Sequence, residues 1–367
     1  MSINLPDKVK NLPLTPGVYL MKDSQGQTLY VGKAKNLKNR VQSYFRNSTN
    51  HSPKIKKLVK HLRDFDYILT DTEFEAFMLE CQLIKSIKPL YNRMMKSPQS
   101  FIYISISLTG KHRKIDIAYN PIENECKVYF GPFTSRSNVE RALQGLKECF
   151  KLNCSNPNGT NSACLNYSLG SYLGRCLGGP AEQQYNDILD RFIGFLKGTD
   201  MSILEDMNQM MLNASETFDF EAASAYRDHI QAVSSLLKKE KVIEFTEENH
   251  NIAAIERLTD STIKLFLIKR TDILFSDNYA AVGNMEEKIK TNILAYFKND
   301  EANAAGDISR HEVDAAHIVY RYLHSDSCSY LIIPENWLDP ENHSTLDLAL
   351  KNLLNNPQHF EPPIYHE

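Results

Sequence analysis

The sequence predicts a mixed α/β fold (α+β) built from several parts, and three observations lead to this fold class. First, 42% of the 367 residues are hydrophobic and 24% are charged, which is typical of folded globular domains. Second, short runs of β-forming residues bounded by turn residues alternate with segments whose apolar residues recur at helical spacing. Third, residues 201–240 show helical spacing throughout, which indicates a change of architecture along the chain.

Residues 1–97 contain the elements of a small α/β domain. In residues 14–32, the segments GVYLMK and QTLYVG flank the polar turn DSQG, which predicts a β-hairpin. Asn36 is suited to cap a helix that runs to about residue 46. A second helix is expected near residues 53–63.

A strand at residues 67–70 and a further helix complete this domain. Thr72 precedes the helix and Glu75 lies three residues later, which is the spacing of a capping box. Glu75 therefore has a structural reason for its position.

The next part, residues 98–180, is predicted to be an extension with a cysteine-rich loop. The alternating stretch FIYISISL follows Pro98, and a helical pattern covers residues 137–150. Residues 151–180 are rich in Asn, Gly, Ser and Cys and have no periodicity, so they predict an irregular loop. Loops of this length are usually functional or flexible.

Residues 201–240 predict an antiparallel helical hairpin with a break at residues 217–219. A lone hairpin cannot bury both of its faces, so it must pack on the rest of the chain or dock a partner.

A mixed α/β region is expected at residues 250–335. Strand patterns return after residue 250, followed by helices near 285–298 and 309–324 and by a strand at 330–333. The tail beyond Trp337 carries little signal.

The formal net charge of −3 hides a strong asymmetry. Residues 1–100 contain 17 Lys or Arg and 8 Asp or Glu, and the segment Ser24–Arg63 contains ten basic residues and no acidic one. Such a segment creates a positive field suited to a phosphate backbone, although a solvated basic face would give the same pattern.

The sequence predicts a cytoplasmic protein without a membrane partner. The N-terminus has no continuous apolar region, and no stretch approaches the roughly 18 apolar residues of a membrane span. Seven cysteines are an odd count in a long chain without a signal peptide, which argues against a disulfide scaffold.

Two tyrosines of the hairpin are candidates for a functional site. A four-residue turn, Asp23–Gly26, would place Tyr19 directly opposite Tyr30 with both phenols on one face. Directly opposed tyrosines also occur as simple cross-strand packing. Gly32 ends the second strand and permits close approach of the backbone.

Further candidates follow the hairpin. Lys33, Leu37, Arg40 and Tyr44 recur at intervals of four, three and four residues, so on a helix they would share one face. A lysine, an arginine and a third tyrosine would then line one side of the tyrosine pair.

Glu80 lies in the middle of an apolar helical stripe. Its neighbours three and four residues away are Ala76, Phe77, Leu83 and Ile84. Burying a carboxylate there without a cation or hydrogen-bond donors costs several kcal/mol, so Glu80 needs a partner. That partner is either the cation of a buried salt bridge or a divalent metal, and one carboxylate plus waters suits Mg²⁺.

These residues resemble a known family. The motifs are GVY at 17–19, YVGKAKNLKNRVQSYF at 30–45, EAFMLECQLIKSIKPLYN at 75–92 and YFGPFTS at 129–135. Together they resemble the GIY-YIG nuclease domain of the UvrC excision-repair nucleases. The similarity continues through the cysteine-containing segment 164–176 and, more faintly, to about residue 335.

The resemblance implies a hydrolytic site. Tyr30 would be the general base that activates water, with Tyr19 and Lys33 adjusting its hydrogen bonding and its pKa. Glu80 would bind one Mg²⁺ or Mn²⁺. A tyrosine with an ordinary pKa near 10 is a poor base at neutral pH, so a nearby lysine and metal are needed to lower it.

Supporting roles are implied for three more residues. Arg40 would hold the scissile phosphate and its developing charge, Tyr44 would support that geometry, and Asn92 would organise the site. Hydrolysis of a phosphodiester needs an activated water, an electrophilic cation and charge stabilisation, and this set supplies all three.

The hairpin segment 216–233 resembles the UVR motif through which UvrC binds UvrB. The residues implied to contact the partner are Phe218, Phe220, Ala223, Arg227 and Ile230. The implied function is the 3′ incision beside a lesion in damaged double-stranded DNA that UvrB has marked.

The chain ends before the ribonuclease-H-like and helix-hairpin-helix domains of full-length UvrC, which resembles the short homologue Cho and predicts that the 5′ incision is missing. Two alternatives stay open. One is a non-catalytic adaptor that competes with UvrC for UvrB. The other is a structure-specific nuclease that acts without UvrB.

The cysteines depart from the family pattern. In UvrC, four cysteines bind an iron–sulfur cluster. Cys154, Cys164 and Cys176 match the first three, but the expected fourth position falls near residues 180–181, and Cys149 would have to replace it. The alternative is a set of reduced cysteines left from an ancestral site.

Overall fold

The computed structural model confirms the mixed α/β class and divides the chain into two compact units. Unit 1 joins Met1–Pro98 to Phe245–Glu367, and unit 2 is Gln99–Glu244. The structure describes residues 5–46, 52–92, 101–109, 113–119, 121, 126–133, 135–154, 163–280, 284–298, 308–309 and 312–355.

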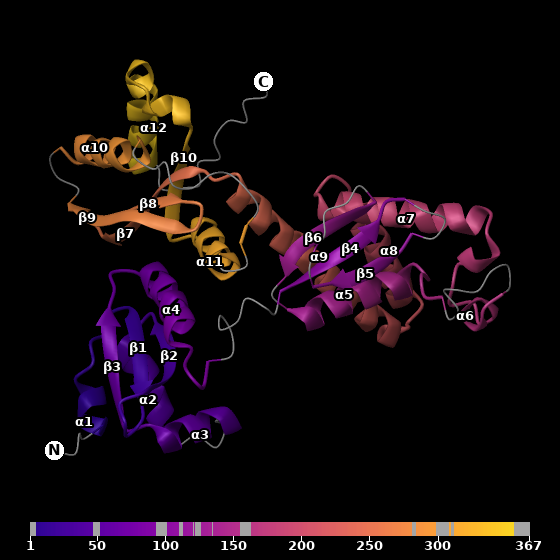
Figure 1. The fold of residues 1–367 in the computed structure, drawn as a ribbon, viewed down its shortest axis with the longest axis horizontal. Helices are drawn as coiled ribbons and strands as arrows, with labels where there is room; N and C mark the ends of the chain where they lie inside the picture. Colours follow the sequence, from indigo (N-terminus) through magenta and orange to yellow (C-terminus); the bar gives the residue numbers. More distant parts are fainter. Residues whose placement is uncertain are drawn as a thin grey trace. The chain divides into compact units, whose positions relative to one another are not determined.

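The N-terminal part of unit 1 is a three-stranded antiparallel sheet with helices on both faces (Figure 1). Its elements are α1 (Leu5–Lys10), β1 (Gly17–Lys22), β2 (Thr28–Ala34), α2 (Leu37–Phe45), α3 (Pro53–His61), β3 (Asp64–Leu69) and α4 (Glu73–Ile87). The strand order is β2-β1-β3, so β2 lies at an edge.

The two faces of this sheet bury different helices. Val18 and Val31 pack against Ala76 and Ile84 of α4. On the other face, Tyr19 joins a buried cluster that draws on α1, α2 and α3. Alternation along β1 and β2 therefore sends successive side chains to opposite helical layers.

The hairpin register differs from the one predicted. Tyr19 pairs with Gly32, and Met21 rather than Tyr19 pairs with Tyr30. The turn is one residue longer than expected, because the Asp23 carboxylate accepts the amide of Gln27 at 2.9 Å.

A register irregularity between Met21 and Lys22 moves the pairing by one more residue, so the register differs from the predicted one by two residues. Since a shift of two residues preserves the face, Tyr19 and Tyr30 still lie on the same side as diagonal neighbours.

Both predicted helix caps are confirmed. Asn36 accepts the amide of Asn39 at 2.9 Å. Thr72 and Glu75 form the capping box, with both hydrogen bonds at 3.1 Å. Caps depend on residues within one helical turn, which is why the sequence alone located them.

The C-terminal part of unit 1 is a second sheet, with strand order β10-β7-β8-β9. Its elements are β7 (Asn251–Thr259), β8 (Thr262–Lys269), β9 (Asp272–Ala280), α10 (Met285–Lys298), α11 (Val313–Leu323), β10 (Cys328–Ile333), two short 3-10 helices (Glu335–Leu338 and Pro340–Asn342) and α12 (His343–Asn355). The sequence beyond Trp337 gave little indication of secondary structure. It nevertheless contains α12, which buries Leu346, Leu350 and Leu353 at helical spacing.

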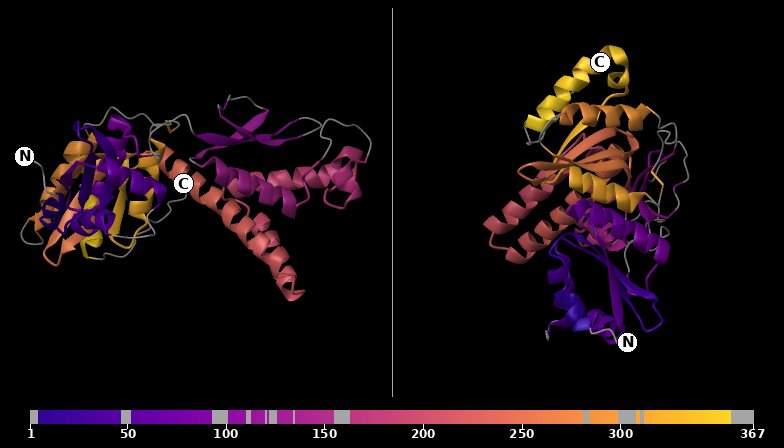
Figure 2. Two further views of the ribbon diagram at one scale, coloured as in Figure 1. Left: turned by 90° about the horizontal axis from the view of Figure 1, so that it is seen from below. Right: turned by 90° about the vertical axis from the view of Figure 1, so that its left-hand side faces the viewer.

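Helix α4 is shared by the two sheets of unit 1. The helices α10 and α12 cover one face of the C-terminal sheet, and α11 and α4 cover the other (Figure 2, right). Phe74 of α4 stacks on Tyr322 of α11 with ring centroids 3.9 Å apart and meets Phe266 of β8 edge-on at 5.1 Å. Lys264 of β8 also pairs with Glu75, at 3.0 Å.

Unit 2 joins the predicted extension and the helical hairpin in one fold. Its elements are β4 (Ile102–Ser107), β5 (Ile115–Ala118), β6 (Lys127–Phe133), α5 (Arg136–Cys149), α6 (Leu165–Ser168), a 3-10 turn (Arg175–Leu177), α7 (Pro180–Leu196), α8 (Ser202–Glu216) and α9 (Phe220–Glu247). The sheet order is β5-β4-β6. Helix α7 was not predicted from the sequence.

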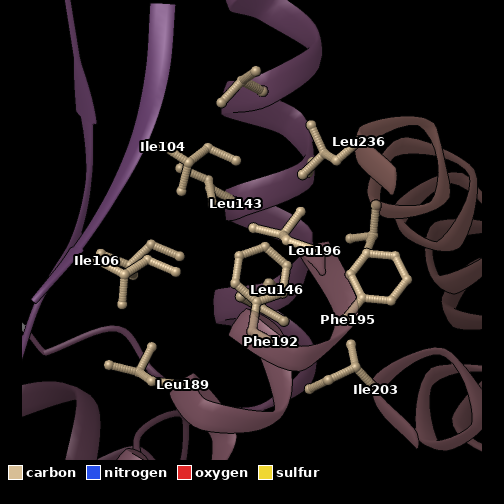
Figure 3. Packing of buried hydrophobic residues seen from close by; sticks show 14 of the residues in the cluster. Ile104, Ile106, Leu143, Leu146, Leu189, Phe192, Phe195, Leu196, Ile203 and Leu236 are labelled. Carbon is tan, nitrogen blue, oxygen red and sulfur yellow. The ribbon is translucent and has the colours of Figure 1, made fainter. Parts of the chain in front are cut away.

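One buried cluster holds unit 2 together. Figure 3 shows side chains from β4, α5, α7, α8 and α9 pointing into the same core. Phe192 and Phe195 of α7 are fully buried there, and Ile203 of α8 and Leu236 of α9 pack into the same cluster. The hairpin α8–α9 thus packs one side on its own unit, and its break at residues 217–219 lies where it was predicted.

Glu256 of β7 is a half-buried carboxyl near the first turn of α4. Burial, together with the charges of Glu75 and Glu73, raises its pKa to about 7. The folded state holds this proton more tightly than the unfolded chain does. The proton's contribution to the free energy of unfolding is therefore fully present below about pH 4 and is lost as the pH rises to about 7.

We expect Glu256→Gln to remove this loss. At pH 8 the variant should be more stable than the wild type by about 1 to 2 kcal/mol, allowing for solvent screening of a half-buried group, and at pH 4 the two should be equal. Urea denaturation at both pH values measures the difference. The exposed Glu335→Gln is the control, and a pH-independent difference would contradict the assignment.

Candidate active site and cysteine cluster

Five predicted residues line one open cleft of about 610 Å³ beside the edge strand β2. They are Tyr19, Tyr30, Lys33, Arg40 and Glu80. The cleft thus combines phenols, cations and a carboxylate contributed by β1, β2, α2 and α4.

The tyrosines form a hydrogen-bonded group on the α2 face of the sheet. The hydroxyls of Tyr19 and Tyr44 lie 2.9 Å apart, and the ring centroids of Tyr19 and Tyr30 are 6.1 Å apart. A Cβ atom on Gly32 would lie 2.3 Å from the Tyr19 hydroxyl, so the buried ring fits only over a glycine. This confirms the close backbone approach that was predicted for Gly32.

Burial raises the pKa of two of these phenols, Tyr19 and Tyr30. It raises the pKa of Tyr19 well above its ordinary value, and the neighbouring Tyr44 raises it further. The pKa of Tyr30 is also raised, first by burial and then by the charges of Tyr44 and Glu80, while Arg40 lowers it. The guanidinium carbon of Arg40 lies 5.3 Å from the Tyr44 ring centre.

Glu80 meets the edge of β2. Its carboxylate accepts the backbone amide of Lys33 at 3.1 Å, and burial raises its pKa. The Lys33 ammonium lies 4.4 Å from the Phe77 ring centre and pairs with Glu73 at 2.5 Å. Among the ion pairs of the described residues none includes Glu80, so the salt-bridge interpretation of this residue is not supported.

The surroundings of Glu80 suit a divalent cation. A partly desolvated carboxylate with one oxygen fixed by an amide gains from a positive charge in the cleft, and Mg²⁺ is commonly held by one or two carboxylates with several waters. Glu80 would hold such an ion, in a cleft open enough to admit those waters.

Asn92 organises the edge strand and does not line the cleft. Its side chain accepts the Val31 amide at 3.0 Å and donates to the Val31 carbonyl at 2.9 Å. It thereby satisfies both backbone groups of an edge residue, as a neighbouring strand would.

The expected helical stripe from Lys33 to Tyr44 is only partly correct. Lys33 belongs to β2 and not to the following helix, and Leu37 is a fully buried core residue. Arg40 and Tyr44 do share one face of α2, four residues apart. A spacing rule for one element fails when its residues are divided between two.

Two residues at the site were not predicted from the sequence. Glu73 pairs with Lys33, and Lys54 of α3 lies 5.9 Å from the Tyr30 ring centre. The basic segment Ser24–Arg63 contained Lys54, but nothing local placed it above a particular ring.

Of the five predicted partner-binding residues, Ala223 is half-buried in α9 and the other four divide into two groups. Phe218 and Phe220 at the hairpin turn are 79% and 64% exposed, and their rings meet edge to face at 6.1 Å. Arg227 is exposed and pairs with Asp228. Ile230, in contrast, packs against the core of unit 2.

Three of the four candidate cysteines converge. The sulfur atoms of Cys154, Cys164 and Cys176 all lie within 4.8 Å of one another. Cys149 is not part of this group and lies at the end of α5 in the core of unit 2, where burial raises the pKa of its thiol to about 11. The structure therefore does not support the expectation that Cys149 replaces the fourth ligand.

No helix among the described residues is long and apolar enough to cross a membrane.

Family comparisons match three successive segments of the chain. Residues 15–93 match the UvrC-like GIY-YIG domain, residues 101–195 match the middle domain of the UvrC/Cho excinucleases, and residues 202–236 match the UvrB/UvrC motif.

Curated relatives match over nearly the whole chain. UvrABC system protein C of Acetivibrio thermocellus is 30% identical over 376 residues, which covers 99% of this chain and 60% of that protein. The same protein of Clostridium kluyveri is 34% identical over 367 residues, covering 96% of this chain and 58% of the relative.

A solved structure is also similar to the N-terminal part. It is the magnesium-bound GIY-YIG N-terminal endonuclease domain of UvrC from Thermotoga maritima, at 35% identity and a TM-score of 0.23. The match covers 25% of this chain and 100% of that domain.

We expect Mg²⁺ to stabilise the wild type and not Glu80→Gln. Glutamine can still accept the Lys33 amide, but it removes the charge that would attract the ion. At a free Mg²⁺ concentration of 100 times its Kd, the wild type should gain about 2.7 kcal/mol. Thermal denaturation with and without Mg²⁺ measures this gain, with Glu335→Gln as the control. Equal stabilisation of both proteins would contradict the assignment.

Proposed function

Because the chain belongs to the UvrC family of GIY-YIG excision-repair proteins, we propose that it is a metal-dependent DNA endonuclease that makes the 3′ incision beside a lesion in a UvrB–DNA complex. One observation carries the proposal. A half-buried carboxylate, Glu80, is held by a backbone amide in the same cleft as Tyr30, Lys33 and Arg40. This set contains a cation ligand, a base and groups that stabilise phosphate charge.

Glu80 is the residue that would hold Mg²⁺, or Mn²⁺ in its place. The cation supplies electrophilic assistance and neutralises charge on the phosphate when it is bound. Its positive charge would also lower the pKa of Tyr30, which burial raises.

Tyr30 is the proposed general base. Its hydroxyl oxygen, once deprotonated, takes a proton from the attacking water. Tyr19 and Tyr44, joined by their hydrogen bond, fix the ring environment beside it. Lys33, on the same strand, adds positive charge near the base while its ammonium is paired with Glu73.

Arg40 is the proposed phosphate ligand. It is exposed at the cleft, and its guanidinium can donate two parallel hydrogen bonds to phosphate oxygens. Lys35 lines the same cleft, and Lys54 lies above Tyr30. These cations would attract the DNA backbone without reading its sequence.

Lesion targeting would come from UvrB, bound through the α8–α9 hairpin. Phe218 and Phe220 present exposed aromatic surface at the turn, which is the kind of group that dominates binding at protein interfaces. A substrate of bacterial chromosomal DNA implies a cytoplasmic location.

A nicking assay on damaged plasmid with UvrB and Mg²⁺ tests the proposed function. Tyr30→Phe should lower the rate about 10²- to 10⁴-fold, because it removes the base. Glu80→Gln should lower it at least as much. Tyr67→Phe, on an exposed face of β3, should cut like the wild type.

The same assay separates the alternatives. UvrB binding without nicking by the wild type would favour the non-catalytic adaptor. Nicking that does not depend on UvrB would favour an independent structure-specific nuclease. Undiminished nicking by Glu80→Gln would refute the assignment of the site.

We further expect Phe218→Ala and Phe220→Ala each to weaken binding to UvrB at least about tenfold, since truncating a buried aromatic anchor costs more than about 1.4 kcal/mol. Calorimetric titration with UvrB measures this. Leu169→Ala removes a side chain that is also exposed, at 70%, and should bind normally. Normal binding by both Phe variants would exclude the hairpin turn as the interface.

A further inference from the structure

Three cysteines meet at one point of unit 2 although they come from separate segments. Cys154 follows α5, Cys164 precedes α6, and Cys176 lies in the 3-10 turn Arg175–Leu177. Their sulfur atoms all lie within 4.8 Å of one another. The distance separating these residues along the chain means that the tertiary fold brings the thiols together.

The residues do not fit a cluster bound by four cysteines. The expected fourth position falls at Pro180 and Ala181, whose side chains offer no ligand atom. Cys149 is packed in the apolar core and stands outside the group. In a four-iron cluster each thiolate binds a different iron, which spreads the sulfurs farther apart than around one ion.

The geometry points to a single ion. Around tetrahedral zinc, with zinc–sulfur bonds of about 2.3 Å, neighbouring sulfurs lie about 3.8 Å apart. Three sulfurs already within 4.8 Å of one another need to move by about 1 Å or less to reach that spacing. We propose that Cys154, Cys164 and Cys176 bind one Zn²⁺ as thiolates, with an external ligand such as water in the fourth position.

The surroundings suit such a site. Tyr172 is buried at 3% exposure and hydrogen-bonds to Cys154, so its hydroxyl can donate to a metal-bound thiolate. Zn²⁺ with three thiolates carries a net negative charge. Arg175, next to Cys176 in the chain, is buried with its guanidinium 4.1 Å from the Tyr185 ring centre and supplies a nearby positive charge.

The ion would act as a structural crosslink. Leu165 and Leu169 near the cluster are 66% and 70% exposed, so this part of the loop has little apolar core of its own. A shared metal would tie the end of α5 to α6 and to the start of α7, and its binding energy would contribute to folding.

Metal and sulfide analysis of the full chain tests this inference. After anaerobic purification from medium that contains both iron and zinc, we expect one zinc ion per chain and no acid-labile sulfide. Cys154→Ser, Cys164→Ser and Cys176→Ser should each lose the zinc. Three controls should keep it: Cys149→Ala, Cys126→Ser and Glu80→Gln, the last of which shows that the ion is not in the nuclease cleft.

Two further measurements distinguish the loss of a zinc ligand from misfolding of the serine variants. The reduced wild type should give a sulfur-to-cobalt charge-transfer band with Co²⁺, and Cys176→Ser should not, although its circular dichroism is unchanged. Tyr172→Phe keeps all three thiols and should weaken zinc binding about 10- to 100-fold in competition with a chelator. Tyr167→Phe is the matched control.

Either of two results would overturn the proposal. Bound iron and acid-labile sulfide in place of zinc would restore an iron–sulfur cluster, and Cys149→Ala would show whether Cys149 is its fourth ligand. A reduced chain whose seven thiols react equally fast with and without Zn²⁺ would show that the three cysteines are not a metal site.

Discussion

The candidate active site depends on the outer edge of β2. An edge strand exposes unpaired amides and carbonyls, and in this protein they bind two side chains of the candidate site. The Lys33 amide binds Glu80, and both backbone groups of Val31 bind Asn92. The carboxylate and the strand that bears Tyr30 are therefore joined through the backbone, whose position varies less than that of a long side chain.

The helix that carries Glu80 is held from both sides. Ala76 and Ile84 pack on the N-terminal sheet, while Phe74 and Met78 pack on the C-terminal sheet. An apolar helix buried between two sheets has little surface left for a polar residue, and Glu80 occupies part of it beside the cleft. The C-terminal part of unit 1 thus supports the helix that carries Glu80.

Unit 2 combines two different ways of ordering a chain. The helices α5, α7, α8 and α9 bury aromatic and aliphatic side chains in one core, which leaves the hairpin turn with Phe218 exposed. In the cysteine-rich loop Leu165 and Leu169 stay exposed, so a crosslink between the loop's segments is the physical alternative to a core there.

What the sequence determined by itself was local. The β-hairpin, the caps at Asn36 and Thr72, the helical break at residues 217–219 and the need for a partner at Glu80 follow from neighbours within a few positions. The resemblance to a nuclease family supplied the roles of the site residues.

Tertiary structure decided the rest, because it depends on contacts between distant segments. The register that places Gly32 rather than Tyr30 opposite Tyr19 comes from the geometry of the turn and a register irregularity in the pairing of β1 with β2. Lys33 lies on a strand and Arg40 on a helix, and three cysteines come together without the fourth. Both results depend on packing between distant segments, which the spacing of residues along the sequence does not predict.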